Sequence, residues 1–393
     1  MSRSKHVATR AVQEGIATDT AFGAVTPPLY LSANFEFDSP GVCGPYDYTR
    51  SANPTRQLLA EALAGLEGGE GAVVTASGMA AITVVLQLLK RGDIVVAPHD
   101  CYGGTHRLFR AMSERVGFTV LWLDQRKEES LATVKTARPK IVWVETPSNP
   151  LLRVTDIERW ADAAHEVGAL CAVDNTFLSP ALQQPIALGA DLVIHSTTKF
   201  INGHSDVVGG AVVARNASLA DELTWWANCL GVTGSPFDAY QTLRGLRTLS
   251  ARQTVHETNA MEIVSLLCQN DLVRTVYHPS LRDHQGHDIA RRQQSGFGSL
   301  ISFELAGGRK AVESFVNNLE YFTLAESLGG VESLIAHPLT MTHASMTEEA
   351  RKEAGITDGL LRISVGIEHV EDLKADLSAA LRRCEEVSVA EVI

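Results

Sequence analysis

The sequence lacks the cysteine patterns that mark metal centres and disulfide frameworks. It has six cysteines and no CxxC pair, and they are scattered at positions 43, 101, 171, 229, 268 and 384. Four potential ligands lie close together between His99 and His106, but no matching pair occurs elsewhere, so we expect no metal site. Scattered, unpaired cysteines are typical of a protein that stays in the reducing cytoplasm.

An export signal and a membrane span are also lacking. Residues 1–7 are not followed by an apolar core, so we expect no signal peptide and a cytoplasmic location. The stretch 71–89 carries no charge over 19 residues, which approaches the length of a transmembrane helix. Thr75, Gly78 and Gln87 interrupt it, and we expect a strand, a turn and a buried helix there instead.

Positive charge is scarce. There are 34 Lys and Arg residues against 46 Asp and Glu residues, which gives a net charge of −12. Nucleic acids and anionic membranes need a basic face on their partner, so we expect neither as a partner. A local basic pocket for a small anion is not excluded. With 393 residues, 45% of them hydrophobic, the chain is expected to fold into at least two domains.

Between about residues 55 and 215, short apolar runs alternate with helical patterns, and we find no internal repeat. The predicted strands are 71–75, 93–97, 119–124, 140–145, 169–174, 191–195 and 210–215. Strands that alternate with helices predict a mostly parallel sheet covered on both faces. The fold class is therefore α/β, with a large, mostly parallel sheet of seven strands.

Three parts follow from the pattern. Residues 1–60 are broken by Pro and Gly, so we expect an N-terminal arm that lies on another surface. Residues 61–250 are expected to form the α/β domain, and residues 251–393 a smaller C-terminal α+β domain. The elements expected in this last part include helices at 251–269, 314–319 and 368–383, a strand of alternating type at 298–305 and another strand at 359–366.

Two polar residues follow neighbouring strands of the predicted sheet. Lys199 comes after strand 191–195, and Asp174 ends strand 169–174. A lone lysine at a strand end most often reaches solvent, but ligands of open parallel sheets bind outside the carboxyl ends of the strands. A carboxylate can hold a pyridine nitrogen protonated, and a lysine can hold an aldehyde as a Schiff base. The pair is the minimal apparatus of a pyridoxal 5'-phosphate (PLP) site.

Further candidates lie at the same rim, and each has an ordinary structural alternative. Gly78 and Met79 open a predicted helix, whose free amides favour an anion, although most such glycines only make the turn. The Tyr102 ring could stack on a flat cofactor or be a half-buried loop tyrosine. Asn149 could bond a cofactor hydroxyl or cap a turn. Tyr48 and Arg50 could reach a phosphate or make ordinary arm contacts.

These residues lie in motifs that together resemble the Cys/Met-metabolism enzymes of PLP fold type I. The resemblance covers nearly the whole chain. Its motifs are 48–50, 77–79, 100–104, 145–150, 173–176, 195–199, 203–206, 326–330 and 361–364. It implies a large sheet domain with a smaller C-terminal domain, PLP as the cofactor, and a homotetramer built from two dimers that share their sites.

The resemblance also implies a role for each matched residue. Lys199 would form the Schiff base and carry protons, Asp174 would pair with the ring nitrogen, and Tyr102 would stack on the ring. The residues expected to hold the phosphate are Gly78, Met79, Ser196 and Thr198, together with Tyr48 and Arg50 from the neighbouring subunit. Those expected to contact the substrate are Asn149, which would also touch the ring hydroxyl, Arg362 as the carboxylate clamp, Ser327 beside the lysine, and Glu326, Asp47 and Arg107 in the distal pocket.

Within the family, the segments 98–104, 175–182, 225–228 and 231–234 resemble the members that join O-succinyl-L-homoserine to L-cysteine more than the γ- or β-lyases. A γ-elimination of cystathionine and a sulfhydrylase reaction stay open as alternatives. A Rossmann-type nucleotide binder is a different class of protein, and the absence of a G-x-G-x-x-G motif at a strand–helix turn argues against it. Retention of every matched cofactor position argues against an inactive structural homologue.

Overall fold

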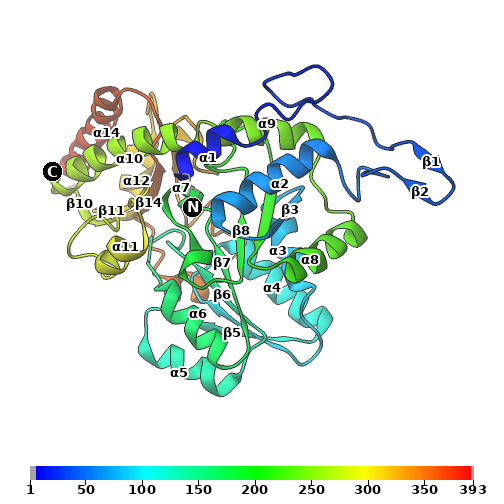
Figure 1. The fold of residues 1–393 in the computed structure, drawn as a ribbon. Coiled ribbons are helices and arrows are strands. Elements are labelled where there is room, and N and C mark those ends of the chain that lie inside the picture. Colours follow the sequence, from blue (N-terminus) through cyan, green and yellow to red (C-terminus); the bar gives the residue numbers. More distant parts are fainter. Residues whose placement is uncertain (1–5, 345, 391–393) are drawn as a thin grey trace.

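A seven-stranded sheet forms the centre of the structure, a computed structural model that describes residues 6–344 and 346–390 (Figure 1). The strand order is β3-β9-β8-β7-β6-β4-β5, and only β9 runs antiparallel to its neighbours. The strands are β3 (Gly71–Thr75), β4 (Ile94–Pro98), β5 (Thr119–Leu123), β6 (Ile141–Glu145), β7 (Leu170–Asp174), β8 (Leu192–His195) and β9 (Gly210–Ala214). The prediction of a mostly parallel sheet of seven strands is confirmed.

Helices cover both faces of this sheet, as the near-continuous apolar strands require. One face packs under α2, α6, α7, α9 and the short 3₁₀ helix η1, and the other under α3, α4 and α8, with α5 beside α6. These elements are α2 (Pro54–Glu67), α3 (Gly78–Leu86), α4 (Gly103–Val116), α5 (Glu128–Ala137), α6 (Ile157–Glu166), α7 (Ser179–Leu182), η1 (Pro185–Leu188), α8 (Ala217–Leu230) and α9 (Pro236–Leu246).

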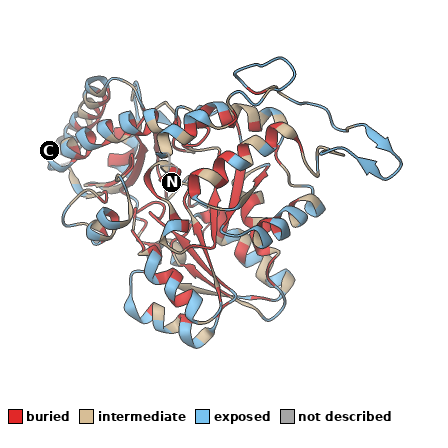
Figure 2. Ribbon diagram, viewed as in Figure 1, coloured by how far each residue is buried: buried red, intermediate tan, exposed pale blue. Residues whose placement is uncertain are grey.

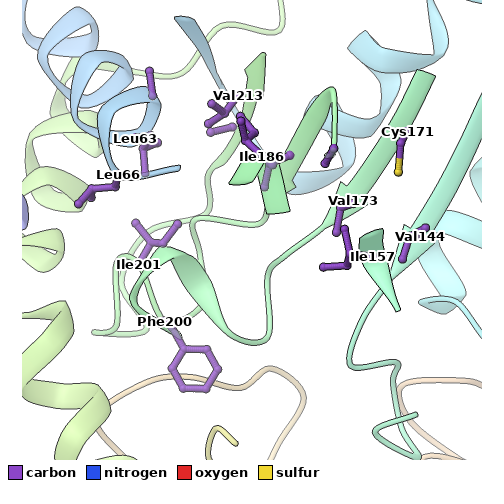
Figure 3. Packing of buried hydrophobic residues seen from close by; sticks show 14 of the residues in the cluster. Leu63, Leu66, Val144, Ile157, Cys171, Val173, Ile186, Phe200, Ile201 and Val213 are labelled. Carbon is purple, nitrogen blue, oxygen red and sulfur yellow. The ribbon is translucent and has the colours of Figure 1, made fainter. Parts of the chain in front are cut away.

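The side chains alternate between the two cores along each strand. Val213 points toward α2, and Val144 and Val173 point toward α6, where Ile157 lies beside them (Figure 3). Their chain neighbours point the other way, and Trp143 is fully buried under α4. Because both faces are buried, a polar residue has room only where a strand ends, which is why the rim carries the chemistry.

A second, five-stranded sheet of order β10-β11-β14-β13-β12 packs against α10, α12 and α14 (Figure 1). Its strands are β10 (Val273–Tyr277), β11 (Leu300–Leu305), β12 (Thr323–Leu324), β13 (Leu334–Ala336) and β14 (Leu360–Ser364). The accompanying helices are α10 (Leu249–Cys268), α11 (His287–Gln293), α12 (Gly308–Val316), α13 (Glu348–Ala354) and α14 (Val370–Ala390). The predicted domain boundaries at residues 60 and 250 remain a prediction.

Two predictions for this part of the chain are wrong in detail. The helix expected at 314–319 is α12, which begins six residues earlier and ends at Val316, because the apolar positions that face β11 start at Ala311. The strand expected to alternate between buried and exposed positions is buried almost throughout. Its polar face is covered as well, since Ser302 donates a hydrogen bond to Pro150 O of the larger part at 2.6 Å.

The N-terminal arm is mostly exposed, and its short hairpin of β1 (Phe37–Ser39) and β2 (Val42–Cys43) projects from the body (Figures 1 and 2). The arm also contains a short helix, α1 (Val7–Gln13), whose Ala11 is buried beside α2. Within the described residues, no helix is long and apolar enough to span a membrane.

Candidate active site

A pocket of about 300 Å³ opens where β6, β7 and β8 end and α3 begins. Segments from the second sheet close its other side, so the pocket joins parts of the chain that are far apart in sequence. It brings together eleven of the predicted site residues: Gly78, Met79, Tyr102, Asn149, Asp174, Ser196, Thr198, Lys199, Glu326, Ser327 and Arg362. Their individual roles remain predictions, but the fold brings all eleven residues to one edge of the sheet.

Lys199 lies in the turn that follows β8. Its backbone amide bonds back to Ser196 O at 3.2 Å, and its carbonyl accepts from Gly203 N at 2.8 Å. Its Nζ donates to Ser327 Oγ at 2.7 Å. Burial, together with the nearby Arg362 guanidinium, lowers the pKa of Lys199 to about 8. The amine is therefore much closer to its neutral, nucleophilic form near neutrality than an exposed lysine is.

Ser327 reaches the lysine from a strained turn. Its φ is +95°, a conformation that residues with a Cβ rarely adopt and that tends to mark functional sites. Gly329 follows in the same turn with φ +75°, where an added Cβ would lie 2.8 Å from Phe200 N. Gly329 N donates to Ser364 Oγ at 2.8 Å, which fixes the turn against the strand that carries Arg362.

Two buried carboxyl groups lie side by side at the pocket floor. Glu145 ends β6 and Asp174 ends β7, and their Cα atoms are partners in the parallel ladder. Burial raises the pKa of Asp174. Burial, and then the neighbouring Asp174, raises the pKa of Glu145 well above its ordinary value. A cation placed against Asp174 would supply the opposite charge that this site needs.

The start of α3 forms a narrow cradle with the turn after β8. Ser77 caps the helix by accepting from Ala80 N at 3.1 Å, while the first amides of a helix have no partner within it. A Cβ on Gly78 would lie 2.8 Å from Ser196 Cβ, and one on Gly210 would lie 2.2 Å from Ser77 O. Only glycine fits at either position, so backbone amides can approach an anion there closely.

Thr198 lines the same cradle but its hydroxyl is already engaged. It donates to Gly209 O at 3.1 Å and accepts from Gly209 N at 3.0 Å. Thr176 is in a comparable position, since its Oγ1 accepts from Ser196 N at 2.9 Å. These bonds fix the loops around the cradle, and they show that a phosphate would have to share the Thr198 hydroxyl with Gly209.

Arg362 presents a buried guanidinium to the pocket. It is 3% exposed, and burial lowers its pKa to about 10, which still leaves it charged at neutral pH. NH1 donates to Asn149 Oδ1 at 2.9 Å and NH2 to Ser327 O at 2.8 Å, while the buried Nε atom has no partner among the described residues. A buried cation held by neutral oxygens is suited to bind a carboxylate.

Tyr102 stands at the mouth of the pocket, at the N-cap position of α4. Its backbone amide donates to Glu145 Oε2 at 2.8 Å, which fixes the backbone of Tyr102 next to the pocket floor. A Cβ on Gly104 would lie 2.4 Å from the Tyr102 ring and 3.0 Å from Met79 Sδ. The glycine therefore gives the ring the space to lie across the pocket, as stacking on a flat cofactor requires.

The single chain does not bring four predicted residues to this pocket. Asp47, Tyr48 and Arg50 lie in the arm, where Arg50 NH1 donates to Asn228 O at 2.9 Å and to Asn228 Oδ1 at 2.6 Å. Arg107 lies on α4 at an adjacent hollow of about 230 Å³. For these four, the expected contacts with cofactor or substrate remain predictions.

Among the pocket-lining residues that were not predicted as site residues are Glu145, Thr176 and Thr342. Glu145 and Thr176 were visible only as parts of motifs, and their strand-end positions were the signal that would have selected them. Thr342 lies on a loop with no pattern in the sequence that points to the site. Among residues 6–344 and 346–390, no group of three or more His, Cys, Asp or Glu side chains is placed to hold a metal ion.

The residues present fit PLP. A lysine with a lowered pKa faces the pocket, a buried carboxyl lacks a counter-charge, a helix start forms a cradle that only glycines permit, and a tyrosine ring flanks the opening. The lysine suits the aldehyde of PLP and the carboxyl suits its pyridinium nitrogen. The helix start suits the phosphate, and the tyrosine ring suits the aromatic ring.

Comparison with known proteins agrees with this fit. A sequence model of the family described as "Cys/Met metabolism PLP-dependent enzyme" matches residues 8–382. Cystathionine gamma-synthase of Escherichia coli is 54% identical over 95% of this chain and 97% of its own. Cystathionine beta-lyase of Lactococcus lactis is 46% identical over 95% and 98%, and cystathionine gamma-lyase of Bacillus subtilis is 44% identical over the same shares.

A solved structure agrees as well. Cystathionine gamma synthase from Xanthomonas oryzae pv. oryzae, in complex with aminoacrylate and cysteine, superposes with a TM-score of 0.96 at 60% identity, covering 97% of this chain and 99% of its own. At that level of similarity, the overall fold is shared.

The lowered pKa of Lys199 makes the attachment of PLP dependent on pH. Only the neutral amine attacks an aldehyde, so attachment to the apoprotein should accelerate as pH rises and level off above about 8, where Lys199 is deprotonated. Borohydride trapping at timed intervals, followed by mass spectrometry of the Lys199 peptide, measures the rate. A rate that keeps rising to the ordinary lysine pKa would contradict the lowered value, and Lys199→Ala provides the blank.

Proposed function

The chain belongs to the Cys/Met metabolism PLP-dependent enzymes, and from this premise we propose that it joins O-succinyl-L-homoserine and L-cysteine to give L-cystathionine and succinate. This γ-replacement is the reaction of a cystathionine γ-synthase, a step of transsulfuration in methionine biosynthesis. PLP is the cofactor. The observation that carries the proposal is the identity of 54% and 60% to the γ-synthases of Escherichia coli and Xanthomonas oryzae pv. oryzae, against 46% and 44% to the two lyases named above. A γ-synthase of Mycobacterium bovis is 46% identical.

The substrate would be held by its α-carboxylate against Arg362. A bidentate fork of this kind fixes the orientation of a carboxylate as well as its position. Asn149 already accepts from Arg362 NH1 through Oδ1, which leaves its Nδ2 group to donate to the ring hydroxyl. Glu326 lines the pocket beside the clamp, and Arg107 would meet the distal end of the substrate from α4.

The reaction needs proton removal at the α-carbon and then at the β-carbon before the γ-substituent leaves. When bound, PLP supplies the electron sink for the negative charge that develops at these carbons. Lys199 Nζ would accept and return the protons, because its pKa of about 8 lies close to neutrality. Ser327 Oγ, 2.7 Å away, would hold Nζ between the two carbons.

Asp174 and Tyr102 would orient the cofactor during these steps. The Asp174 carboxylate would keep the ring nitrogen protonated and the Tyr102 ring would keep the cofactor plane fixed. The amides of Gly78 and Met79, with Ser196 and Thr198, would hold the phosphate. Each residue would thus contact a different part of one flat molecule.

The arm would complete the site of a neighbouring subunit. Tyr48 and Arg50 would reach the neighbour's phosphate and Asp47 its distal pocket, in a homotetramer built from two dimers. The arm is exposed in the single chain, and its apolar side chains support this role: Phe22, Val25, Leu31, Phe37 and Val42 are all open to solvent (Figure 2). We also propose the division into an arm, a PLP-binding domain and a C-terminal domain at residues 60 and 250, and a cytoplasmic location.

A γ-lyase is the second candidate function. Lyases of the family match the chain over the same share of its length, and γ-elimination of cystathionine to cysteine, 2-oxobutanoate and ammonia uses the same lysine, clamp and cofactor. A sulfhydrylase, which takes sulfide in place of cysteine, is the third. None of the three needs a site residue that the others lack.

Product analysis tests the proposed function. The purified protein is incubated with L-cysteine and either O-succinyl- or O-acetyl-L-homoserine, and separately with cystathionine alone, and the products are identified by mass. We expect cystathionine and succinate from the first mixture. Fast release of 2-oxobutanoate from cystathionine without synthesis from either acylated homoserine would overturn the proposal in favour of a lyase. Lys199→Ala should give no product from any mixture.

Asp174→Asn should fold normally but lose most of its activity. The amide has the shape of the carboxylate but not its charge, so the ring nitrogen would no longer stay protonated. We expect kcat to fall by about 10²-fold or more, as for the loss of other preorganised electrostatic contacts, while the melting temperature of the apoprotein changes little. A kcat near that of the wild type would reduce Asp174 to an ordinary strand-end residue.

Mixed dimers test the proposed role of the arm. Arg50→Ala and Lys199→Ala subunits should each be poorly active alone. In a mixed dimer, the site with the intact Lys199 receives its arm from the subunit with the intact Arg50. Co-refolding should therefore restore up to about a quarter of wild-type activity, since half of the randomly paired dimers are mixed and each has one good site.

Mass spectrometry of the intact assemblies confirms the mixing. If mixed dimers are present and activity does not exceed the mean of the two parents, the arm serves its own subunit.

A further inference from the structure

A buried carboxylate lies behind the pocket, on the opposite face of the seven-stranded sheet. Glu67 is the last residue of α2, and its Oε1 accepts from His195 Nε2 at 2.6 Å and from Asn175 Nδ2 at 2.9 Å. None of the three residues is more than 1% exposed. None of them lines the pocket, and the proposed mechanism uses none of them.

These contacts hold the backbone that carries the site. Asn175 directly follows Asp174, and His195 directly precedes Ser196. Successive side chains of a strand point to opposite faces, so Asp174 and Ser196 face the pocket while Asn175 and His195 face Glu67. Asn175 N also donates to Ile194 O at 3.0 Å. Glu67 therefore joins, from behind, the two strand ends that present the ring anchor and the phosphate cradle.

The network continues to a third strand end. Gln183 Nε2 donates to Asn175 Oδ1 at 3.0 Å and to Thr146 O at 3.1 Å. Thr146 follows Glu145 at the end of β6 and leads to Asn149. A single connected group of polar side chains thus contacts the ends of β6, β7 and β8, all of which contribute to the pocket.

Packing alone does not account for this group. It lies beside the apolar cluster of Leu63, Leu66 and Val173 (Figure 3), where burying charge is costly and apolar side chains of similar volume are often as stable. Glu67 Oε2 and His195 Nδ1 are buried without a hydrogen-bond partner among the described residues. A buried polar pair with unsatisfied atoms is more easily understood if the pair has a role in the site.

Thr176 connects Asp174 to this group. Its amide donates to Asp174 Oδ1 at 3.0 Å, and its hydroxyl accepts from Ser196 N at 2.9 Å. Ser196 directly follows His195, so the contact of His195 with Glu67 lies one residue away from this bond. Burial raises the pKa of the Asp174 carboxyl, and the hydrogen bonds from Thr176 are the largest of the effects that oppose burial.

We propose that Glu67 and His195 are positioning residues for PLP: Glu67, through its hydrogen bonds with Asn175 and His195, holds the ends of β7 and β8 together, and this keeps Asp174 aligned with the ring nitrogen. The inference rests on the proposed role of Asp174. It gives a role to residues on the far side of the sheet from the pocket, whereas the direct contacts with PLP are expected on the pocket side.

The test compares Glu67→Gln and His195→Asn with the wild type. Each apoprotein is reconstituted with PLP labelled with ¹⁵N in the ring, and the ¹⁵N chemical shift reports whether the ring nitrogen is protonated. Release of PLP into an excess of a trapping apoprotein gives its dissociation rate. Glu67→Gln keeps the length of the side chain and an oxygen for Asn175, so this variant decides the question if His195→Asn does not fold.

Asp191→Asn is the matched control. Asp191 accepts from His165 Nε2 at 2.9 Å and from Cys171 N at 2.8 Å, and it lies at the other end of β8. The substitution removes the charge of a carboxylate–histidine pair on the same strand, but far from Asp174. A purely structural effect of losing such a pair should therefore appear in the control as well.

We expect Glu67→Gln to shift the ring-nitrogen signal toward the unprotonated value and to release PLP about tenfold faster or more, a change worth roughly 1.4 kcal/mol. Asp191→Asn should change neither. The double variant Glu67→Gln/His195→Asn should be little worse than the poorer single variant, because the two residues act as a unit.

A protonated ring nitrogen and wild-type release in Glu67→Gln would overturn the inference, as would equal effects in Asp191→Asn. Both readouts need only bound PLP. A protein that failed the product test above would still answer this question, so failure of the proposed function and failure of this inference are distinguishable.

Discussion

The parallel register of β6, β7 and β8 is the constraint on which the site depends. Backbone hydrogen bonds make Glu145, Asp174 and Ile194 lateral neighbours, so the residues that follow them emerge at one edge within a few ångströms. Both faces of the sheet are buried, and the polar side chains of the site gather at this edge, where ligands of open parallel sheets bind. The turn that carries Lys199, the pair of Glu145 and Asp174, and the start of α3 all meet at this edge.

Charge is distributed unevenly across the resulting pocket. Arg362 comes from the second sheet and Lys199 from the turn after β8, and burial lowers the pKa of both. Asp174 and Glu145 form the floor, where burial opposes the ionised form of each. Cations and carboxyls are thus held apart by the space that PLP and a substrate carboxylate would fill. The bound molecules would supply the charges that each side lacks, and this explains how so many titratable groups are tolerated in one buried place.

Much of the large sheet could be predicted because its strands are continuous runs of Val, Ile and Ala bounded by polar residues, and such runs survive in any tertiary context. The strand-end residues Asp174 and Lys199 could be selected by the same logic. The start of helix α12 and the burial of both faces of strand β11 could not be predicted. For β11, the polar face is covered by the loop around Pro150, about 150 residues away. The contact of Glu67 with His195 was also invisible in the sequence, because the two are 128 positions apart and the motif 195–199 does not indicate a partner for His195. The arm has no core of its own, so its conformation depends on what it touches.

Arg362 and Ser327 come from the second sheet and its preceding loop, whereas Lys199 and Asp174 belong to the first. This order along the chain has a consequence for biosynthesis. The seven-stranded sheet, with its lysine and its glycine cradle, is complete when residue 214 has left the ribosome, and domains formed early in synthesis can fold before the rest. The carboxylate clamp follows only near the C-terminal end. A nascent chain therefore carries every residue that would anchor PLP from its own subunit before it carries the residue that would recognise an amino acid.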